Sequence, residues 1–158
     1  FKGMPADWKI DVVGDGLYLD ELKELAGRMG VAVTFHGWLD RSDDRLKELF
    51  ARSSIFVFPS EAENFPTVLL EAMSAGMAIV TSNAGGCPEV VGEAAMLIPP
   101  RNAGAIRRSV DELINKSSLI ERLAAAGVER AAGFRWDSVA RRYIELYEQL
   151  VGNNIGRR

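Results

Sequence analysis

The feature that most constrains the fold is a strand-and-helix unit that repeats along residues 10–100. Short apolar runs typical of strands occur in "WKIDVVGDG", "VAVTFHG", "SIFVFPS", "MAIVTS" and "AAMLIPP", and apolar residues at helical spacing lie between them. Strands that alternate with helices favour a parallel sheet, because each helix returns the chain to the same end of the sheet. We therefore expect an α/β fold, a parallel sheet with helices on both faces.

Helix boundaries are marked by glycine and proline. A helix over 19–29 is expected to stop at Gly30, "DDRLKELFARS" reads as a short helix, and a third should carry Pro66 in its first turn and end at Gly76. Beyond residue 100 the pattern is helical over about 103–115, 117–131 and 136–151. The tail "GNNIGRR" is polar, and we expect it to be mobile.

Composition restricts the class of protein. The 158 residues suit one domain, 1–158, and the start at Phe1 suggests a fragment of a longer chain. The 19 basic and 22 acidic residues give a net charge of -3, which argues against nucleic acid as a partner. No apolar run reaches membrane-spanning length, and the single Cys87 fits a reducing, cytoplasmic compartment.

Ligands of parallel sheets bind where loops follow the carboxyl ends of the strands, beside helix N-termini that favour anions. Four loops are expected there: Gly14 to Leu17, His36 to Asp40, Pro59 to Pro66 and Ser82 to Glu89. Ordinary turns of a parallel sheet would also account for each loop taken singly.

Several common sites are incomplete in this sequence. "GDG" opens like a dinucleotide fingerprint but has Leu19 where the third glycine belongs, and no stretch matches the phosphate loop of nucleotide hydrolases. His36 has no second histidine or cysteine pair to complete a metal site, so we expect a structural role for it and no metal. Cys87 is expected to be a small packed residue.

Two carboxylates, Glu63 and Glu71, bracket an apolar stretch that opens with Phe65-Pro66. Glu63 precedes the expected helix and Glu71 lies inside it, so together they are placed to hold two ends of one ligand. A glutamate near a helix start also stabilises the helix, and this simpler reading explains either residue singly.

The sequence around these two glutamates is more specific than the glutamates alone. "FPSEAENFPTVLLEAMSAGMAIVTSNAGGCPEVVG" resembles the donor-binding signature of the retaining glycosyltransferases of family four, which have the GT-B fold and two glutamates separated by seven residues. "VVGDG", "VTFHGWL", "AAMLIPP" and "FRWDSVARRYIELY" also follow in the family's order, so the resemblance covers nearly the whole chain.

The resemblance implies a Rossmann-like, C-terminal donor-binding domain with a helical C-terminal segment. Glu71 would hold the ribose hydroxyls, and Glu63 would face the sugar at the reaction centre as the catalytic residue, whether as nucleophile or as an orienting charge. The remaining donor-binding candidates are the backbone of Asn64, Phe65, Pro66, Thr67 and Val68, the loop residues Trp38 and Leu39 near the base, and the glycines Gly14, Gly16, Gly85 and Gly86.

The chain also departs from the family pattern. Asn64 and Pro66 stand where glycine is frequent, and Pro66 removes one N–H donor. The family's preceding strand and helix, with an Arg and a Lys that face the phosphates, are missing, as is the whole N-terminal acceptor domain. The fragment alone should therefore be inactive.

Two functions follow. The first is a retaining glycosyltransferase that uses a nucleotide diphosphate sugar, needs no obligatory metal or other cofactor, and acts on an unknown glycan, lipid or small-molecule acceptor. It would be cytoplasmic, and peripheral at a membrane through the N-terminal domain if at all. The second is a regulatory module that binds a nucleotide sugar without transfer. An epimerase or phosphorylase on the same fold fits the signature less well.

Overall fold

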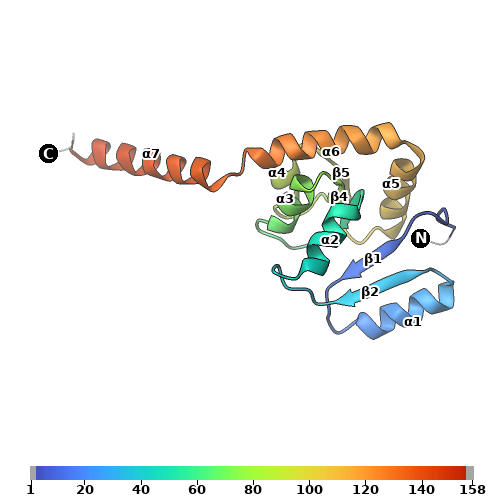
Figure 1. Ribbon diagram of the computed structural model, residues 1–158. Coiled ribbons are helices and arrows are strands. Elements are labelled where there is room, and N and C mark those ends of the chain that lie inside the picture. Colours follow the sequence, from blue (N-terminus) through green and yellow to red (C-terminus); the bar gives the residue numbers. More distant parts are fainter. Residues whose placement is uncertain (1–2, 156–158) are drawn as a thin grey trace.

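The computed structural model describes residues 3–155, in which strands and helices alternate and three helices follow (Figure 1). The strands are β1 Ile10–Val13, β2 Val33–Gly37, β3 Ile55–Phe58, β4 Ala78–Ser82 and β5 Ala95–Ile98. The helices are α1 Leu19–Met29, α2 Asp44–Arg52, α3 Thr67–Ser74, α4 Cys87–Val91, α5 Ala103–Asn115, α6 Ser117–Ala132 and α7 Trp136–Ile155. The expected α/β class and the parallel pairing are confirmed.

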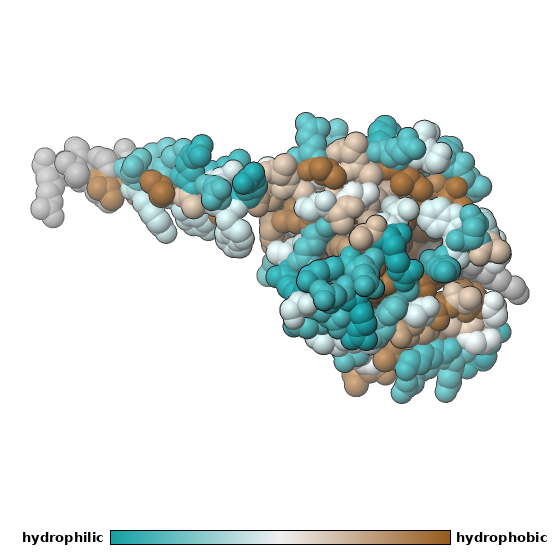
Figure 2. All heavy atoms as spheres, in the orientation of Figure 1, coloured by the Kyte–Doolittle hydropathy of each residue, from teal (hydrophilic) through white to brown (hydrophobic). Residues whose placement is uncertain are grey.

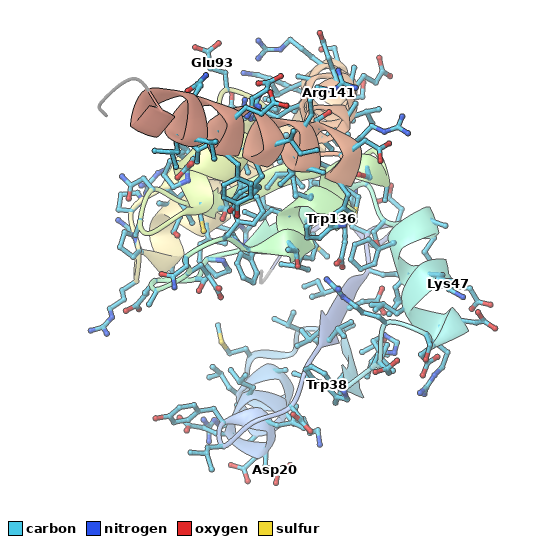
Figure 3. The ribbon with its side chains drawn as sticks, turned by 90° about the vertical axis from the view of Figure 1, so that its left-hand side faces the viewer. Asp20, Trp38, Lys47, Glu93, Trp136 and Arg141 are labelled. Atoms are coloured by element: carbon cyan, nitrogen blue, oxygen red, sulfur yellow. The ribbon has the colours of Figure 1, made fainter. Side chains whose placement is uncertain are left out.

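The strands form two parallel sheets rather than one. β1 pairs with β2, and β3, β4 and β5 pair in that order. Within residues 3–155 no ladder of hydrogen bonds joins β1 to β3, so each of these strands keeps one unpaired edge. Figure 3 shows the consequence, with β1, β2 and α1 as a separate lower part of the molecule.

The larger sheet is covered on both faces, as expected. Every residue of β4 is buried, and successive side chains alternate between two cores because a strand has a period of two. Ile79 points into a core built with α3 and α4, whereas Ala78 and Val80 point into a core built with α5. α6 closes both cores, with Ala126 and Ala131 in the first and Leu123 in the second.

Several helix ends carry the residues that the sequence predicts there. Gly30 ends α1 in the left-handed region at φ 63°, and Gly76 follows α3 with φ 76°. The side chain of Asp43 caps α2 by accepting a hydrogen bond from the Arg45 amide, and Asn102 caps α5 in the same way from Ala105.

Three expected boundaries were wrong. The loop expected over Ser82 to Glu89 is shorter, because α4 begins at Cys87 with Pro88 in its first turn, where proline is well tolerated. Pro66 is the residue before α3 rather than part of its first turn. α7 continues to Ile155, so the first part of "GNNIGRR" is helical, and residues 156–158 lie outside the described residues.

α7 projects away from the body of the molecule (Figure 1). Many of its large apolar side chains are exposed, by between 48% for Leu146 and 85% for Trp136, and Figure 2 shows hydrophobic residues along this projection. Among residues 3–155, no helix has both the length and the apolar character needed to cross a membrane.

Candidate functional site

The loops after β3 and β4 meet at Glu63. The amide of Gly86 donates a 2.6 Å hydrogen bond to the carbonyl oxygen of Glu63. A Cβ on Gly86 would lie 1.9 Å from the carbonyl oxygen of Asn64, and a Cβ on Gly85 would lie 2.6 Å from that of Glu63. Only glycine allows the two backbones to come this close, so the glycine pair fixes the position of Glu63.

Buried hydroxyls of β4 hold the end of β3 and the loop that follows it. The Thr81 hydroxyl donates to the Phe58 carbonyl at 2.7 Å, and the Ser82 hydroxyl donates to the Ser60 carbonyl. The Ser60 hydroxyl in turn lies 3.2 Å from Oε1 of Glu63. The glutamate therefore stands on a loop that is anchored to the central strand of the sheet.

The start of α3 lies directly after this loop. Pro66 caps the helix without a side-chain hydrogen bond, and its carbonyl accepts the Leu69 amide at 3.0 Å. The amides of Thr67 and Val68 precede that bond and have no partner within the helix. This helix start can therefore accept an anion.

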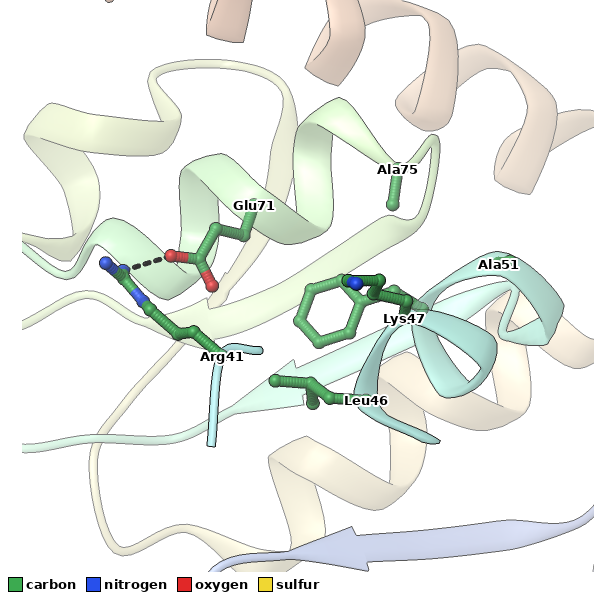
Figure 4. A pocket seen from close by; sticks show the side chains of 7 residues that line it. Arg41, Leu46, Lys47, Ala51, Glu71 and Ala75 are labelled. Carbon is green, nitrogen blue, oxygen red and sulfur yellow. Dashed lines mark hydrogen bonds and ion pairs between the residues drawn. The ribbon is translucent and has the colours of Figure 1, made fainter. Parts of the chain in front are cut away.

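Glu71 lies on the second turn of α3 and is bonded to the loop after β2. Nη2 of Arg41 donates to Oε1 of Glu71 (Figure 4). The same atom donates to Oγ1 of Thr67 at 2.9 Å. The two charged side chains are 72% and 37% exposed, respectively. They lie at one end of an open hollow between α2 and α3, which is lined by Arg41, Leu46, Lys47, Phe50, Ala51, Glu71 and Ala75.

Phe65 is held by a contact that the sequence did not predict. Its ring is 5.8 Å from the ring of Phe134, which follows α6, and the guanidinium of Arg130 lies 5.3 Å from the same Phe134 ring. Arg130 also donates to the carbonyl oxygens of Glu89 and Val90 in α4. The end of α6 thus supports both α4 and the loop of Glu63.

The loops after β1 and β2 contact each other. The Gly14 amide donates to the Gly37 carbonyl at 2.7 Å, and Gly14 adopts φ 124°, a conformation that glycine tolerates best. No hydrogen bond or ring contact among the described residues joins Gly14 or Gly16 to Glu63 or Glu71. These two glycines stay predicted site residues.

Trp38 and Leu39 differ in exposure. Trp38 is 71% exposed on the part of the molecule that carries α1 (Figure 3), whereas Leu39 is only 5% exposed and belongs to the core. A ligand could therefore reach the side chain of Trp38 and not that of Leu39.

His36 and Cys87 have the structural surroundings expected of them. Nε2 of His36 lies 2.7 Å from Oδ1 of Asp11, and Nη2 of Arg52 donates to Oδ2 of the same carboxylate at 2.8 Å. This pair of contacts ties β2 and α2 to β1. Cys87 is fully buried in the core beside α3. Residues 3–155 contain no group of three or more His, Cys, Asp or Glu side chains that could hold a metal ion.

Two carboxylates in the loops near the site have lowered pKa values. Hydrogen bonds from the side chain and amide of Ser42 lower the pKa of Asp40 below its usual value. The guanidinium of Arg101 hydrogen-bonds Glu61 and lowers the pKa of that carboxyl in the same way. Both carboxylates are therefore ionised at neutral pH.

Comparison with known proteins decides the family. The family model described as "Glycosyl transferases group 1" matches residues 2–130. The chain belongs to the group 1 glycosyltransferases. It is 33% identical over 146 residues to the D-inositol 3-phosphate glycosyltransferase of Streptomyces griseus subsp. griseus, which covers 89% of this chain and 30% of that protein.

Solved structures of similar proteins have the same fold. The Anabaena Alr3699/HepE structure in complex with UDP is 26% identical, with a TM-score of 0.76 over 94% of this chain and 42% of that one. The C-terminal domain of a group 1 glycosyltransferase (LpcC) from Francisella tularensis is also 26% identical, with a TM-score of 0.72 over 81% of this chain and 70% of that one. The group 1 chain spans about a third of the length of the curated relatives it matches.

Proposed function

We propose that this chain is the donor-binding domain of a retaining glycosyltransferase that takes a sugar from a nucleotide diphosphate sugar. The observation that carries the proposal is the placing of Glu63 and Glu71 on either side of the free amides of Thr67 and Val68. Family membership supports it, as does the UDP bound in the related HepE structure.

Each group suits one part of such a donor. The carboxylate of Glu71 would accept hydrogen bonds from the ribose hydroxyls, and the amides of Thr67 and Val68 would donate to the diphosphate. Glu63, held by the Gly85–Gly86 loop, would face the sugar and stabilise the positive charge that develops at the reacting carbon. The helix start would stabilise the departing diphosphate without a metal ion.

Calorimetry on the full-length protein tests the donor assignment. UDP, GDP, ADP and their sugars should be titrated into the wild type, Glu71→Ala and Glu63→Ala. We expect Glu71→Ala to weaken binding of the preferred nucleotide and of its sugar alike, by roughly ten- to a hundredfold. Glu63→Ala should spare the bare nucleotide and lower turnover, since its group acts where charge develops.

The outcomes separate the candidates. Unchanged nucleotide affinity in a folded Glu71→Ala variant would refute the ribose assignment. Donor binding by the wild type with no transfer to any acceptor would favour the regulatory module that binds a nucleotide sugar. The anomeric configuration of the product, read by NMR, tests whether the reaction is retaining.

The two separate sheets support the proposal that a strand and helix before residue 1 complete the domain. Doubly wound folds have the strand order 3-2-1-4-5-6. A strand that precedes β1 in the chain and lies between β1 and β3 gives that order, because both strands have a free edge there. Val13, Leu22, Leu25 and Met29 of this part are each more than 40% exposed, which fits a missing neighbour.

The N-terminal half of the same enzyme is the proposed partner of α7. Trp136, Tyr143, Tyr147, Leu150 and Val151 expose an apolar face on a helix that projects from the body. Residues 136–151 carry two arginines against three acidic residues, so the helix lacks the basic surface that an anionic membrane attracts. The acceptor would bind between the halves, so this fragment should transfer no sugar. The cytoplasmic location and a membrane contact of the N-terminal half stay predictions.

A further inference from the structure

Arg41 is the residue through which the loop after β2 reaches α3. Its Nη2 atom donates a hydrogen bond to Oε1 of Glu71 (Figure 4). The same atom donates a second hydrogen bond, of 2.9 Å, to the hydroxyl of Thr67. Thr67 and Glu71 are four residues apart on α3 and so lie on one face of the helix. One guanidinium therefore links both side chains of that face to a loop about 30 residues earlier in the sequence.

The exposure of the pair shows that its main effect is not on folding stability. Arg41 is 72% exposed and Glu71 37% exposed, and ion pairs this accessible to water contribute little to the free energy of unfolding. The bond to Oε1 restricts the rotamers of the long, flexible Glu71 side chain, and the bond to Thr67 helps to hold Arg41 in place. Ordering such a side chain in advance lowers the entropy that a ligand must otherwise supply on binding.

The contact leaves room for a ligand on the carboxylate. Arg41 bonds to Oε1, so Oε2 of Glu71 is free, and each carboxylate oxygen has two acceptor sites. A pair of vicinal hydroxyls can then bind while Arg41 stays in place. Lys47 also lines the hollow, but its ammonium is paired with Asp44 at 2.7 Å, so it does not compete with Arg41 for Glu71.

We propose that Arg41 is a positioning residue that holds the carboxylate of Glu71 ready for the ribose of the donor. This inference rests on the proposed function of Glu71. The opposite arrangement, in which Arg41 blocks the carboxylate until a ligand displaces it, predicts the opposite change in affinity. The two are separated by the sign of the effect of removing Arg41.

A double-mutant cycle on the full-length protein tests the proposal. UDP binding, or binding of GDP or ADP if the wild type prefers it, is measured by calorimetry for the wild type, Arg41→Ala, Glu71→Ala and the double variant. We expect Arg41→Ala to weaken binding about three- to tenfold and to have almost no effect once Glu71 is alanine. The melting temperature should hardly change.

Kinetics provide a second readout. Because the ribose is remote from the reacting carbon, Arg41→Ala should raise KM for the sugar donor and leave kcat nearly unchanged. The matched control is Arg45→Ala, since Arg45 is a similarly exposed arginine that pairs with Asp43 and not with α3. It should leave nucleotide affinity as in the wild type.

Several results would overturn the proposal. Tighter nucleotide binding by Arg41→Ala would show that Arg41 blocks the site. If Arg41→Ala lowered nucleotide affinity equally in the wild type and in Glu71→Ala, Arg41 would act independently of that carboxylate. Unchanged affinity in Arg41→Ala while Glu71→Ala loses affinity would reject the role of Arg41 and retain the proposed function. Unchanged affinity in Glu71→Ala would reject both.

Discussion

The amide of Gly86 donates a 2.6 Å hydrogen bond to the carbonyl oxygen of Glu63. Glu63 follows β3 and Gly86 follows β4, so this bond joins the two loops at the residue proposed to face the sugar. Since β3 and β4 are neighbours in one parallel sheet, their carboxyl ends bring the loops together, and the two glycines set how closely they approach.

Gly86→Ala should abolish most of the sugar transfer by the full-length enzyme. Its Cβ would meet the Asn64 carbonyl oxygen at 1.9 Å, so one of the two backbones must move and Glu63 must move with it. A displacement of about 1 Å at a catalytic group can cost about a hundredfold in rate. Steady-state kinetics of the purified variant measure the effect.

The control for that variant is Gly27→Ala, because a Cβ on Gly27 in α1 meets nothing within 4 Å. Replacing a helical glycine by alanine removes backbone entropy from the unfolded chain, so this change should leave transfer intact and stabilise the fold slightly. Full activity in Gly86→Ala would show that the glycine pair does not position Glu63.

Leu69→Ala should lower the free energy of unfolding by about 2–5 kcal/mol. Leu69 is fully buried on the inner face of α3 and packs in the core with Met73 and Ile79. Leu97→Ala should lower the free energy of unfolding much less, because the Leu97 side chain on β5 is 43% exposed. Urea unfolding of both variants compares them, and equal losses would contradict the packing of α3 described above.

Much of the fold was predictable because its signals are local. The helix over 19–29 with its stop at Gly30, and the three C-terminal helices near 103, 117 and 136, were predicted from apolar spacing and terminal glycines. The separation of the strands into two sheets was not predicted, because strand pairing depends on residues far apart in the sequence. The residues of β1 and β3 do not by themselves indicate which strand lies beside them.

The candidate site was predictable only in part, for the same reason. The resemblance made Gly85 and Gly86 candidates for the donor site, and the structure brings their backbone into contact with the Glu63 loop, which was not predicted. Arg41 was missed because an arginine in a polar turn has no periodic or motif signal, and its contact with Glu71 spans about 30 residues. The burial of Leu39 and the Phe65–Phe134 contact likewise depend on tertiary packing.

Asp11→Ala should destabilise the protein more than removal of an exposed aspartate. The Asp11 side chain is 16% exposed and bonds to both His36 and Arg52, so its loss leaves two partners of a partly buried network unpaired. Hydrogen bonds to charged groups each contribute about 1.5–3 kcal/mol. Thermal unfolding should show a lower melting temperature for Asp11→Ala. Asp20→Ala should hardly change the melting temperature, because the Asp20 side chain is 93% exposed.

The Asp43 cap of α2 should give a pH-dependent part of the stability. Hydrogen bonds from the side chain and then the amide of Arg45 favour the ionised carboxylate, so the pKa of Asp43 lies below its usual value of 3.8 in the folded protein. A lowered folded pKa means that ionisation stabilises the folded state. This contribution is complete above pH 3.8 and is lost as the pH falls through the lowered pKa.

Asp43→Asn isolates that contribution, because asparagine is also a good N-cap residue but cannot ionise. The wild type should melt at a higher temperature than Asp43→Asn at neutral pH, and the gap should stay constant until the pH approaches 3.8. On further acidification towards about pH 2 the gap should shrink, because the wild-type carboxyl becomes protonated in the folded and unfolded states alike. Melting curves of both proteins across this range measure the gap. If it widened in acid, the ionised carboxylate would be destabilising, and the hydrogen bonds from Arg45 would not be what holds the start of α2.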